Sequence, residues 1–145
     1  MAVAISEEHR ELASMIRSFL RARQVRAASR ALLEAAEERP PEFWAEFADL
    51  GLIGLHLPEE YGGGGHGLPE LVVVAEELGR AVAPGPFLPT MIASAVIADC
   101  GTAAQRAAHL PGLAAGDTPA ALGLSGSLTL TAEPDAGRGV VTGDA

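Results

Sequence analysis

The chain has 145 residues, of which 48% are hydrophobic, so it is long enough and apolar enough to bury a core as a globular protein. Its formal net charge of −9 argues against nucleic-acid binding, because nucleic-acid binders concentrate basic residues on one face. A single cysteine, Cys100, excludes a disulfide framework or a cysteine metal cluster within these residues. The sequence has no signal-peptide pattern and no apolar run of about 18 residues, so we expect a cytoplasmic protein without a membrane span.

An amphipathic helix is the first predicted element. Ser6 is a suitable N-cap, and apolar residues recur at spacings of three and four between Leu12 and Leu20. We expect the helical region to continue to residue 39, with a break near Ser29, until a Pro-Pro pair ends it. Six arginines between residues 10 and 30 are spread around this helix, and we interpret them as a solvated surface.

A short predicted helix over residues 41–50 is followed by an apolar run, Leu52–Leu57, and a glycine cluster. Residues Gly62–Gly67 satisfy the pattern G-x-G-x-x-G of dinucleotide-binding loops. That motif requires a strand directly before the glycines, but Pro58–Tyr61 intervene, two of them acidic, and no second strand follows. We therefore interpret the cluster as a structural corner between two helices. A small nucleotide-binding fold is an alternative that rests on this motif alone.

Three further helices are predicted beyond the corner. The first, over residues 69–79, is apolar on most sides, so we expect it to be largely buried. Its adjacent carboxylates, Glu76 and Glu77, point about 100° apart on a helix and cannot converge as an acid–base pair. A proline-rich connector then leads to helices over residues 90–100 and 103–110, the last interrupted by the proline that follows.

The sequence pattern changes after residue 117. Residues 128–142 place two β-type runs around a segment with turn chemistry, and we predict a β-hairpin there. A lone hairpin is marginally stable, so we interpret it as the first part of a further domain. The sequence thus predicts a mainly α protein, with a helical domain over residues 1–117 and an incomplete β domain over residues 118–145.

Five short motifs in the predicted helical domain resemble the N-terminal helical domain of acyl-CoA dehydrogenases. They are a Leu-Gly-Leu helix end, a Pro-Glu-Glu-Tyr-Gly-Gly corner, a Glu-Glu-Leu-Gly helix end, a Gly-Thr-x-x-Gln helix start and a Leu-Pro-x-Leu-x-x-Gly helix end. They occur in the order of the family, at Leu50–Leu52, Pro58–Gly63, Glu76–Gly79, Gly101–Gln105 and Leu110–Gly116. The resemblance implies a helical bundle domain of this type, followed by the start of a middle β-barrel domain.

The resemblance implies a flavoprotein of lipid metabolism that uses FAD to oxidise an acyl-CoA thioester at its α and β carbons. In the family the catalytic base is a carboxylate of a C-terminal helical bundle, so we expect no catalytic residue in this chain and no activity of the chain alone. The implied partners are the acyl-CoA substrate and the remaining domains or a partner dehydrogenase subunit, in a homo- or hetero-oligomer. A non-catalytic partner subunit or interaction module with the same fold is the alternative.

The resemblance also implies candidate residues of the acyl pocket. In the family, the loop and helix after the Glu-Glu-Leu-Gly motif help to wall this pocket. Plain core packing accounts equally well for apolar side chains at these positions. The corresponding residues are Phe87, Leu88, Pro89 and Ile92.

Candidate flavin contacts follow from the same resemblance. Leu124 and Ser125 stand where the flavin-contacting segment of the first barrel strand begins, but the family's Thr-Glu-Pro-x-x-Gly-Ser-Asp motif does not follow them. A similar sequence, TAEPDAGR, comes later at residues 131–138. We interpret it as the turn of the hairpin rather than as a displaced flavin motif, because its Pro, Asp and Gly are ordinary turn residues.

Overall fold

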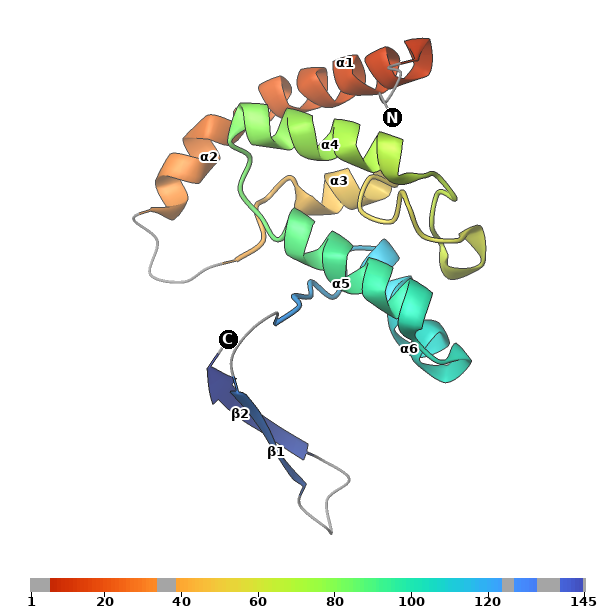
Figure 1. Ribbon diagram of the computed structural model, residues 1–145. Helices are drawn as coiled ribbons and strands as arrows, with labels where there is room; N and C mark the ends of the chain where they lie inside the picture. The colour runs from red at the N-terminus through yellow and green to blue at the C-terminus, as the bar shows by residue number, and fades with distance from the viewer. Residues whose placement is uncertain (1–5, 34–38, 124–126, 133–138, 145) are drawn as a thin grey trace.

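In the computed structural model, the described residues are 6–33, 39–123, 127–132 and 139–144. They form a helical body and a two-stranded hairpin that projects from it (Figure 1). None of the described helices is both long and apolar enough to cross a membrane. The helices of the described part are α1 (Glu7–Ala22), α2 (Val25–Leu32), α3 (Trp44–Asp49), the 3₁₀ helix η1 (Glu59–Tyr61), α4 (Leu68–Ala81), α5 (Phe87–Cys100) and α6 (Ala103–Ala114).

Helix α1 begins at the predicted N-cap. The Ser6 hydroxyl accepts a hydrogen bond from the backbone N–H of His9, and the His9 ring accepts one from the backbone N–H of Ser6, both at 3.2 Å. This reciprocal pair satisfies donors that the first turn of a helix leaves free. The predicted break near Ser29 is wrong, because the chain turns at Gln24, which adopts a left-handed conformation with φ of 49°. The turn at Gln24 brings Val25 into the core.

Helices α1 and α4 pack side by side and run in the same direction (Figure 1). Polar contacts join them near both ends. The Nε2 atom of His9 lies 2.8 Å from Oε1 of Glu70, and Arg17 donates two hydrogen bonds to Glu77, at 3.0 and 2.6 Å. Apolar side chains fill the space between these contacts, so the polar pairs fix the register of an otherwise non-directional interface.

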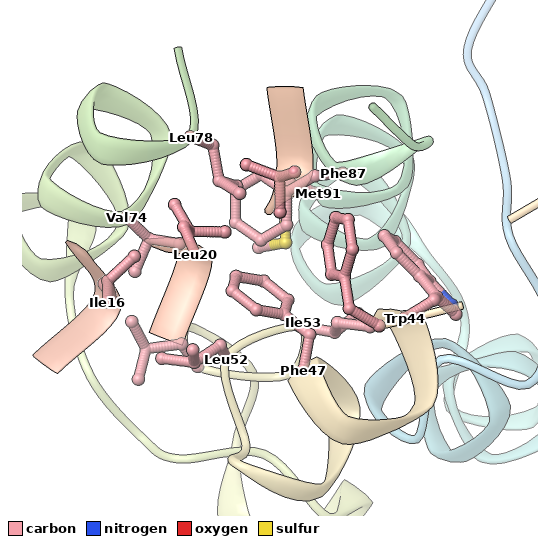
Figure 2. Packing of buried hydrophobic residues seen from close by; sticks show 13 residues of the cluster. Ile16, Leu20, Trp44, Phe47, Leu52, Ile53, Val74, Leu78, Phe87 and Met91 are labelled. Atoms are coloured by element: carbon pink, nitrogen blue, oxygen red, sulfur yellow. The ribbon is translucent and has the colours of Figure 1, made fainter. Parts of the chain in front are cut away.

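Phenylalanine rings form the centre of the core. Phe19 of α1, Phe43, Phe47 of α3 and Phe87 of α5 contact one another with ring centroids 5.7 to 6.4 Å apart, three of the four contacts being edge-to-face. Such pairs add about 0.5–1.5 kcal/mol each beyond their buried area. Figure 2 shows the side chains of α1, α3, α4 and α5 converging on this cluster. The aromatic cluster therefore joins α1, α3 and α5 in the main core of the helical body.

The segment between α3 and α4 is the predicted corner. Its apolar run, Leu52–Leu57, is mostly buried but forms no strand. The backbone N–H of Gly64 donates to the carbonyl of Gly54 at 3.0 Å, and that of Gly65 donates to the carbonyl of Leu57 at 2.9 Å. A Cβ atom on Gly63 would lie 2.0 Å from the Leu57 carbonyl oxygen. The glycines thus let the loop fold back against its own backbone.

Two predicted helix ends are displaced in the structure. Gly79 was expected to cap the helix over residues 69–79, but α4 continues to Ala81 and ends at Val82, which is left-handed with φ of 52°. Helix α5 begins at Phe87, three residues before the predicted start. Pro89 does not prevent this, because it falls in the first turn, where a missing N–H costs no helical hydrogen bond.

Helix α6 runs through Pro111 to Ala114, although the sequence predicts an interruption there. The prediction of its start is confirmed, since the Thr102 hydroxyl accepts a hydrogen bond from the backbone N–H of Gln105 at 3.3 Å. An internal proline costs a helix about 3 kcal/mol. The helix continues because its last turn buries three side chains against Leu57 in a second apolar cluster, and these side chains are Leu110, Leu113 and Ala114.

The predicted hairpin is present as two antiparallel strands, β1 (Ser127–Ala132) and β2 (Gly139–Asp144). Their register pairs Thr129 with Thr142 and Leu130 with Val141. The predicted turn between the strands lies outside the described residues. That these strands begin a further β domain stays a prediction.

Candidate functional site

Helix α5 carries the residues predicted to wall an acyl pocket, and it divides them between two environments. Phe87 points into the core, where its ring centroid lies 5.7 Å from that of Phe47 at an interplanar angle of 82°. The side chain is only 5% exposed. Phe87 therefore packs in the core of this chain.

Leu88 and Ile92 lie on the outer face of α5 and are 55% and 48% exposed. Val96 follows at the same spacing of four residues, so the three form one apolar line along the helix, which we call the α5 stripe. Pro89, beside Leu88, is also exposed. Large apolar side chains aligned in this way are typical of a surface that another protein segment or an apolar ligand covers.

A cavity of about 370 Å³ opens between α3, the end of α4 and the start of α5. Its walls are almost wholly apolar and include Phe87, Leu88 and Pro89, whereas Ile92 does not line it. The four predicted pocket residues are therefore close in space, but they do not line one common cavity within the described residues.

Ser94 and His56 form a buried polar pair behind the α5 stripe. The Ser94 hydroxyl donates to the Met91 carbonyl at 3.0 Å, and its Oγ lies 3.1 Å from Nε2 of His56. Nδ1 of the same ring is buried and has no hydrogen-bond partner among the described residues. Burial lowers the pKa of His56, so its ring is neutral at neutral pH.

This pair does not form a nucleophilic centre. A serine nucleophile needs a base that receives its proton and a third group that orients the base. Here the serine proton is directed to a carbonyl, and Nδ1 of His56 lacks an orienting partner. The sequence signal for the pair was a single histidine within an otherwise apolar run, which sequence reasoning missed.

Thr90 links α5 to the segment that leads toward the hairpin. Its buried hydroxyl oxygen accepts a hydrogen bond from the Ala120 N–H at 3.2 Å and lies 3.4 Å from the Ala120 carbonyl oxygen. This contact holds the chain against α5 a few residues before Leu124 and Ser125. Those two predicted flavin contacts lie outside the described residues.

Two of the three carboxylates of α4, Glu76 and Glu77, are bound to arginines, and the third, Glu70, contacts His9. Glu77, 5% exposed, accepts two hydrogen bonds from Arg17, and these bonds hold the pKa of the Glu77 carboxyl below its usual range. Glu76 pairs with Arg80 on the surface. The described residues contain no group of three His, Cys, Asp or Glu side chains that could hold a metal ion. The geometry of α4 is that of a structural helix.

The glycine cluster does not provide a phosphate cradle. The backbone N–H groups of Gly64, Gly65 and His66 donate to carbonyls of the preceding loop, at 2.9 to 3.0 Å. A dinucleotide loop must instead leave such donors free to point at a pyrophosphate. The three donors are not available, so this loop does not bind a nucleotide in the manner of that motif.

The described elements define the class of protein: a domain of packed α-helices with an exposed apolar line on α5. The sequence profile described as "Acyl-CoA dehydrogenase, N-terminal domain" matches residues 6–117. The chain therefore belongs to the acyl-CoA dehydrogenase family.

Named relatives agree with this assignment. The acyl-CoA dehydrogenase FadE12 of Mycobacterium tuberculosis is 42% identical over 105 residues, which are 69% of this chain and 24% of FadE12. The chain thus spans about a quarter of the length of this relative.

Solved structures of related proteins share the fold. A steroid acyl-CoA dehydrogenase described as the Tcur3481-Tcur3483 G363A variant is 37% identical, with a TM-score of 0.73, over 91% of this chain and 39% of that chain. The ChsE4-ChsE5 complex of Mycobacterium tuberculosis is 31% identical, with a TM-score of 0.63, over 81% and 30% of the two chains. An acyl-CoA dehydrogenase of Bacillus anthracis complexed with FAD is 29% identical, with a TM-score of 0.59, over 77% and 19%.

Proposed function

We propose that this chain supplies the N-terminal helical part of a flavoprotein that oxidises an acyl-CoA thioester at its α and β carbons. The observation that carries the proposal is the family match over residues 6–117, which includes the whole helical body. In this proposal the catalytic base lies outside the chain, and the three carboxylates of α4 have structural partners: Glu70 pairs with His9, Glu76 with Arg80 and Glu77 with Arg17. The complete protein is then the active species.

In the proposed reaction, the helical part contributes the exposed face of α5 to the acyl-binding site. In this proposal Leu88, Pro89 and Ile92 face the acyl group and exclude water from it, while Phe87 holds the start of α5 against the core. Exposed leucine and isoleucine side chains suit the apolar tail of a thioester. Residues 118–145 form the first part of the β domain, which Thr90 anchors to α5 through Ala120.

FAD is the cofactor that we propose for the complete protein. The FAD complex of the related Bacillus anthracis dehydrogenase supports this proposal. The described residues do not themselves form a flavin cradle, since the N–H groups of the glycine corner are bound to carbonyls. Leu124 and Ser125 are the residues of this chain that we propose near the flavin, and the other contacts come from the rest of the protein.

A partner dehydrogenase subunit is part of the proposal. The description of ChsE4-ChsE5 as a complex supports an assembly of two related chains in this branch of the family. An uncovered line of large apolar side chains on α5 also favours further protein beside it.

Replacement of Ile92 by glutamate tests the placement of α5. We expect the full-length protein with Ile92→Glu to retain its flavin and lose at least about tenfold in kcat/KM, because a charge would face the acyl tail. Val72→Glu is the matched control, since Val72 is similarly exposed on a different helix, α4. The measurement is the rate of reduction of an artificial electron acceptor with a panel of straight, branched and steroid acyl-CoA substrates.

An unchanged kcat/KM for Ile92→Glu with every substrate would remove α5 from the acyl pocket. An equal loss in Val72→Glu would show that the effect is one of folding or assembly. The flavin absorbance of each variant must match that of the unsubstituted protein for the comparison to hold.

A non-catalytic partner subunit is the second candidate. It is favoured by the missing Thr-Glu-Pro-x-x-Gly-Ser-Asp motif after Ser125. Purification of the full-length protein with its partner, followed by measurement of bound flavin per chain, separates the two. One flavin for each copy of this chain supports the catalytic reading, whereas flavin bound to the partner alone supports the second candidate.

A further inference from the structure

A second cavity lies between the end of α1, helix α2 and the end of α4, and no residue of the α5 stripe lines it. Its volume is about 670 Å³. Although the chain carries a net charge of −9, five of its ten arginines line this one cavity. We call it the arginine cleft. Its polar lining consists of one glutamate, one glutamine and five arginines: Glu77, Gln24, Arg17, Arg21, Arg26, Arg30 and Arg80.

The turn at Gln24 builds the cleft. The turn separates α1 from α2. Each helix contributes two arginines spaced four residues apart, and all four line the same cavity. Arg21 comes from α1, and Arg26 and Arg30 come from α2. A single straight helix would spread these side chains around its surface, as the sequence alone suggested. The apolar side chains of Leu20, Val25 and Ala81 complete the walls.

The cleft has more positive charge than its carboxylates neutralise. Arg17 is bound to Glu77, and Arg80 is bound to Glu76. Arg21 and Arg30 have no ion pair or hydrogen bond with any residue that the structure describes. Arg26 donates to the backbone carbonyl of Arg80 at 3.1 Å, which leaves its charge unbalanced.

We propose that the arginine cleft binds a small phosphorylated molecule, whose phosphate groups Arg21, Arg26 and Arg30 hold while its body lies against the apolar wall. Guanidinium groups match phosphate oxygens with paired hydrogen bonds, and these charge-assisted bonds are the strong ones. Small-molecule cavities typically measure about 300–1,000 Å³, and the cleft falls within that range. The site is independent of the acyl pocket proposed at α5.

The Arg17–Glu77 pair is the support of the site rather than a contact of the ligand. It fixes the floor between α1 and α4, and Glu77 is buried there. The ligand contacts are Arg21, Arg26 and Arg30, which form no ion pair with a carboxylate of the described residues. This division lets the site be tested without disturbing the helix pair.

Calorimetric titration of the full-length protein with ADP and, separately, with inorganic pyrophosphate tests the proposal. We expect saturable binding with one site per chain at low ionic strength. The double variant Arg21→Gln/Arg30→Gln should weaken binding at least about tenfold, since two charge-assisted contacts are lost. Arg21→Lys/Arg30→Lys keeps both charges but loses the paired geometry, so it should also weaken binding several-fold.

Arg10→Gln is the matched control, because it removes one arginine of α1 that lies outside the cleft. Its dissociation constant should stay within about twofold of the unsubstituted protein. Equal weakening by Arg10→Gln would show diffuse attraction and overturn the proposal. Absence of saturable binding of both probes would also overturn it, as would tighter binding of an oligoglutamate peptide than of ADP, which would assign the cleft to an acidic protein segment. Thermal unfolding of each variant confirms that it is folded.

Discussion

Glu77 is a buried carboxylate whose charge is balanced between two helices. It accepts two hydrogen bonds from Arg17, and these bonds, followed by the charge of that arginine, lower the pKa of the Glu77 carboxyl. A carboxyl whose pKa is lower in the folded than in the unfolded protein stabilises the fold at any pH where it is ionised in both of these states. Its contribution is complete above the ordinary pKa of a glutamate, and it is lost as the pH falls through the lowered value.

Glu77→Gln should therefore destabilise the protein at neutral pH, by about 1–2 kcal/mol, because the variant lacks the ionised partner of Arg17. The difference from the unsubstituted protein should shrink as the pH falls below about 4.5, where the glutamate itself becomes protonated. Urea unfolding at several pH values measures both effects. Glu76→Gln is the control, and the change should be much smaller, since its pair with Arg80 is exposed. A difference for Glu77→Gln that does not vary with pH would contradict the account.

Single residues were predicted unevenly from the sequence. The N-caps were predictable from local patterns: Ser6 is a favoured N-cap residue followed by two acids in the first turn, and Thr102 with Gln105 forms a capping box. The contact between His56 and Ser94 was not, because 38 residues separate them and only the packing of α5 brings them together. The sequence likewise could not show that Phe87 is buried and Leu88 is exposed, since burial depends on how α5 is rotated against the core.

At the scale of elements, the glycine corner joins α3 to α4 by folding against itself. Gly63 is the position with the least space, since a Cβ atom there would meet both the backbone and the side chain of Leu57, which is fully buried. Gly79 offers a contrast within α4, because a Cβ atom on it would meet no atom within 4 Å. The two glycines therefore predict opposite responses to the same substitution.

Gly63→Ala should destabilise the protein by at least about 1–3 kcal/mol, because the buried backbone at Leu57 must move to admit the methyl group. Gly79→Ala should stabilise it by about 0.5–1 kcal/mol, since alanine is the better helix former. Both values come from chemical unfolding under the same conditions. If Gly63→Ala proved neutral, the tight contact between the corner and Leu57 would not exist in solution.

The elements themselves were largely predictable, and their ends were not. Periodic apolar residues indicated the helices correctly, but local rules misplaced several boundaries, among them the start of α5. The helical region breaks at Gln24 instead of near Ser29, because the turn buries Val25. Helix α6 passes Pro111 because burial of Leu113 and Ala114 outweighs a local cost of a few kcal/mol. Helix α4 passes Gly79 and ends at the left-handed Val82.

At the scale of the whole molecule, the helical body has two different faces. The α5 stripe leaves Leu88, Ile92 and Val96 uncovered. Between α1, α2 and α4, the arginine cleft gathers positive charge in an acidic chain. Both features are attached to the aromatic core, since Leu20 and Val25 line the cleft and Phe87 precedes the stripe on α5. The apolar face suits the acyl group and the remaining protein, and the charged face suits a separate anion.

Family membership was predictable from the sequence because its five motifs lie at corners and helix ends, where particular residues are required. The profile match over residues 6–117 confirms it. The site was less predictable, because this chain spans about a quarter of the length of FadE12 and the predicted pocket residues line no common cavity among the described residues. The placement of Leu88, Pro89 and Ile92 in that pocket therefore stays a prediction.

Anaerobic addition of acyl-CoA to the full-length protein, purified with its partner if it has one, tests the central claim most directly. The measurement is the visible absorbance of the bound flavin. We predict that the protein is yellow and that a suitable acyl-CoA bleaches it, as two electrons pass from the thioester to FAD. A protein that carries no flavin, or a flavin that none of the straight, branched and steroid acyl-CoA substrates reduces, would contradict the account.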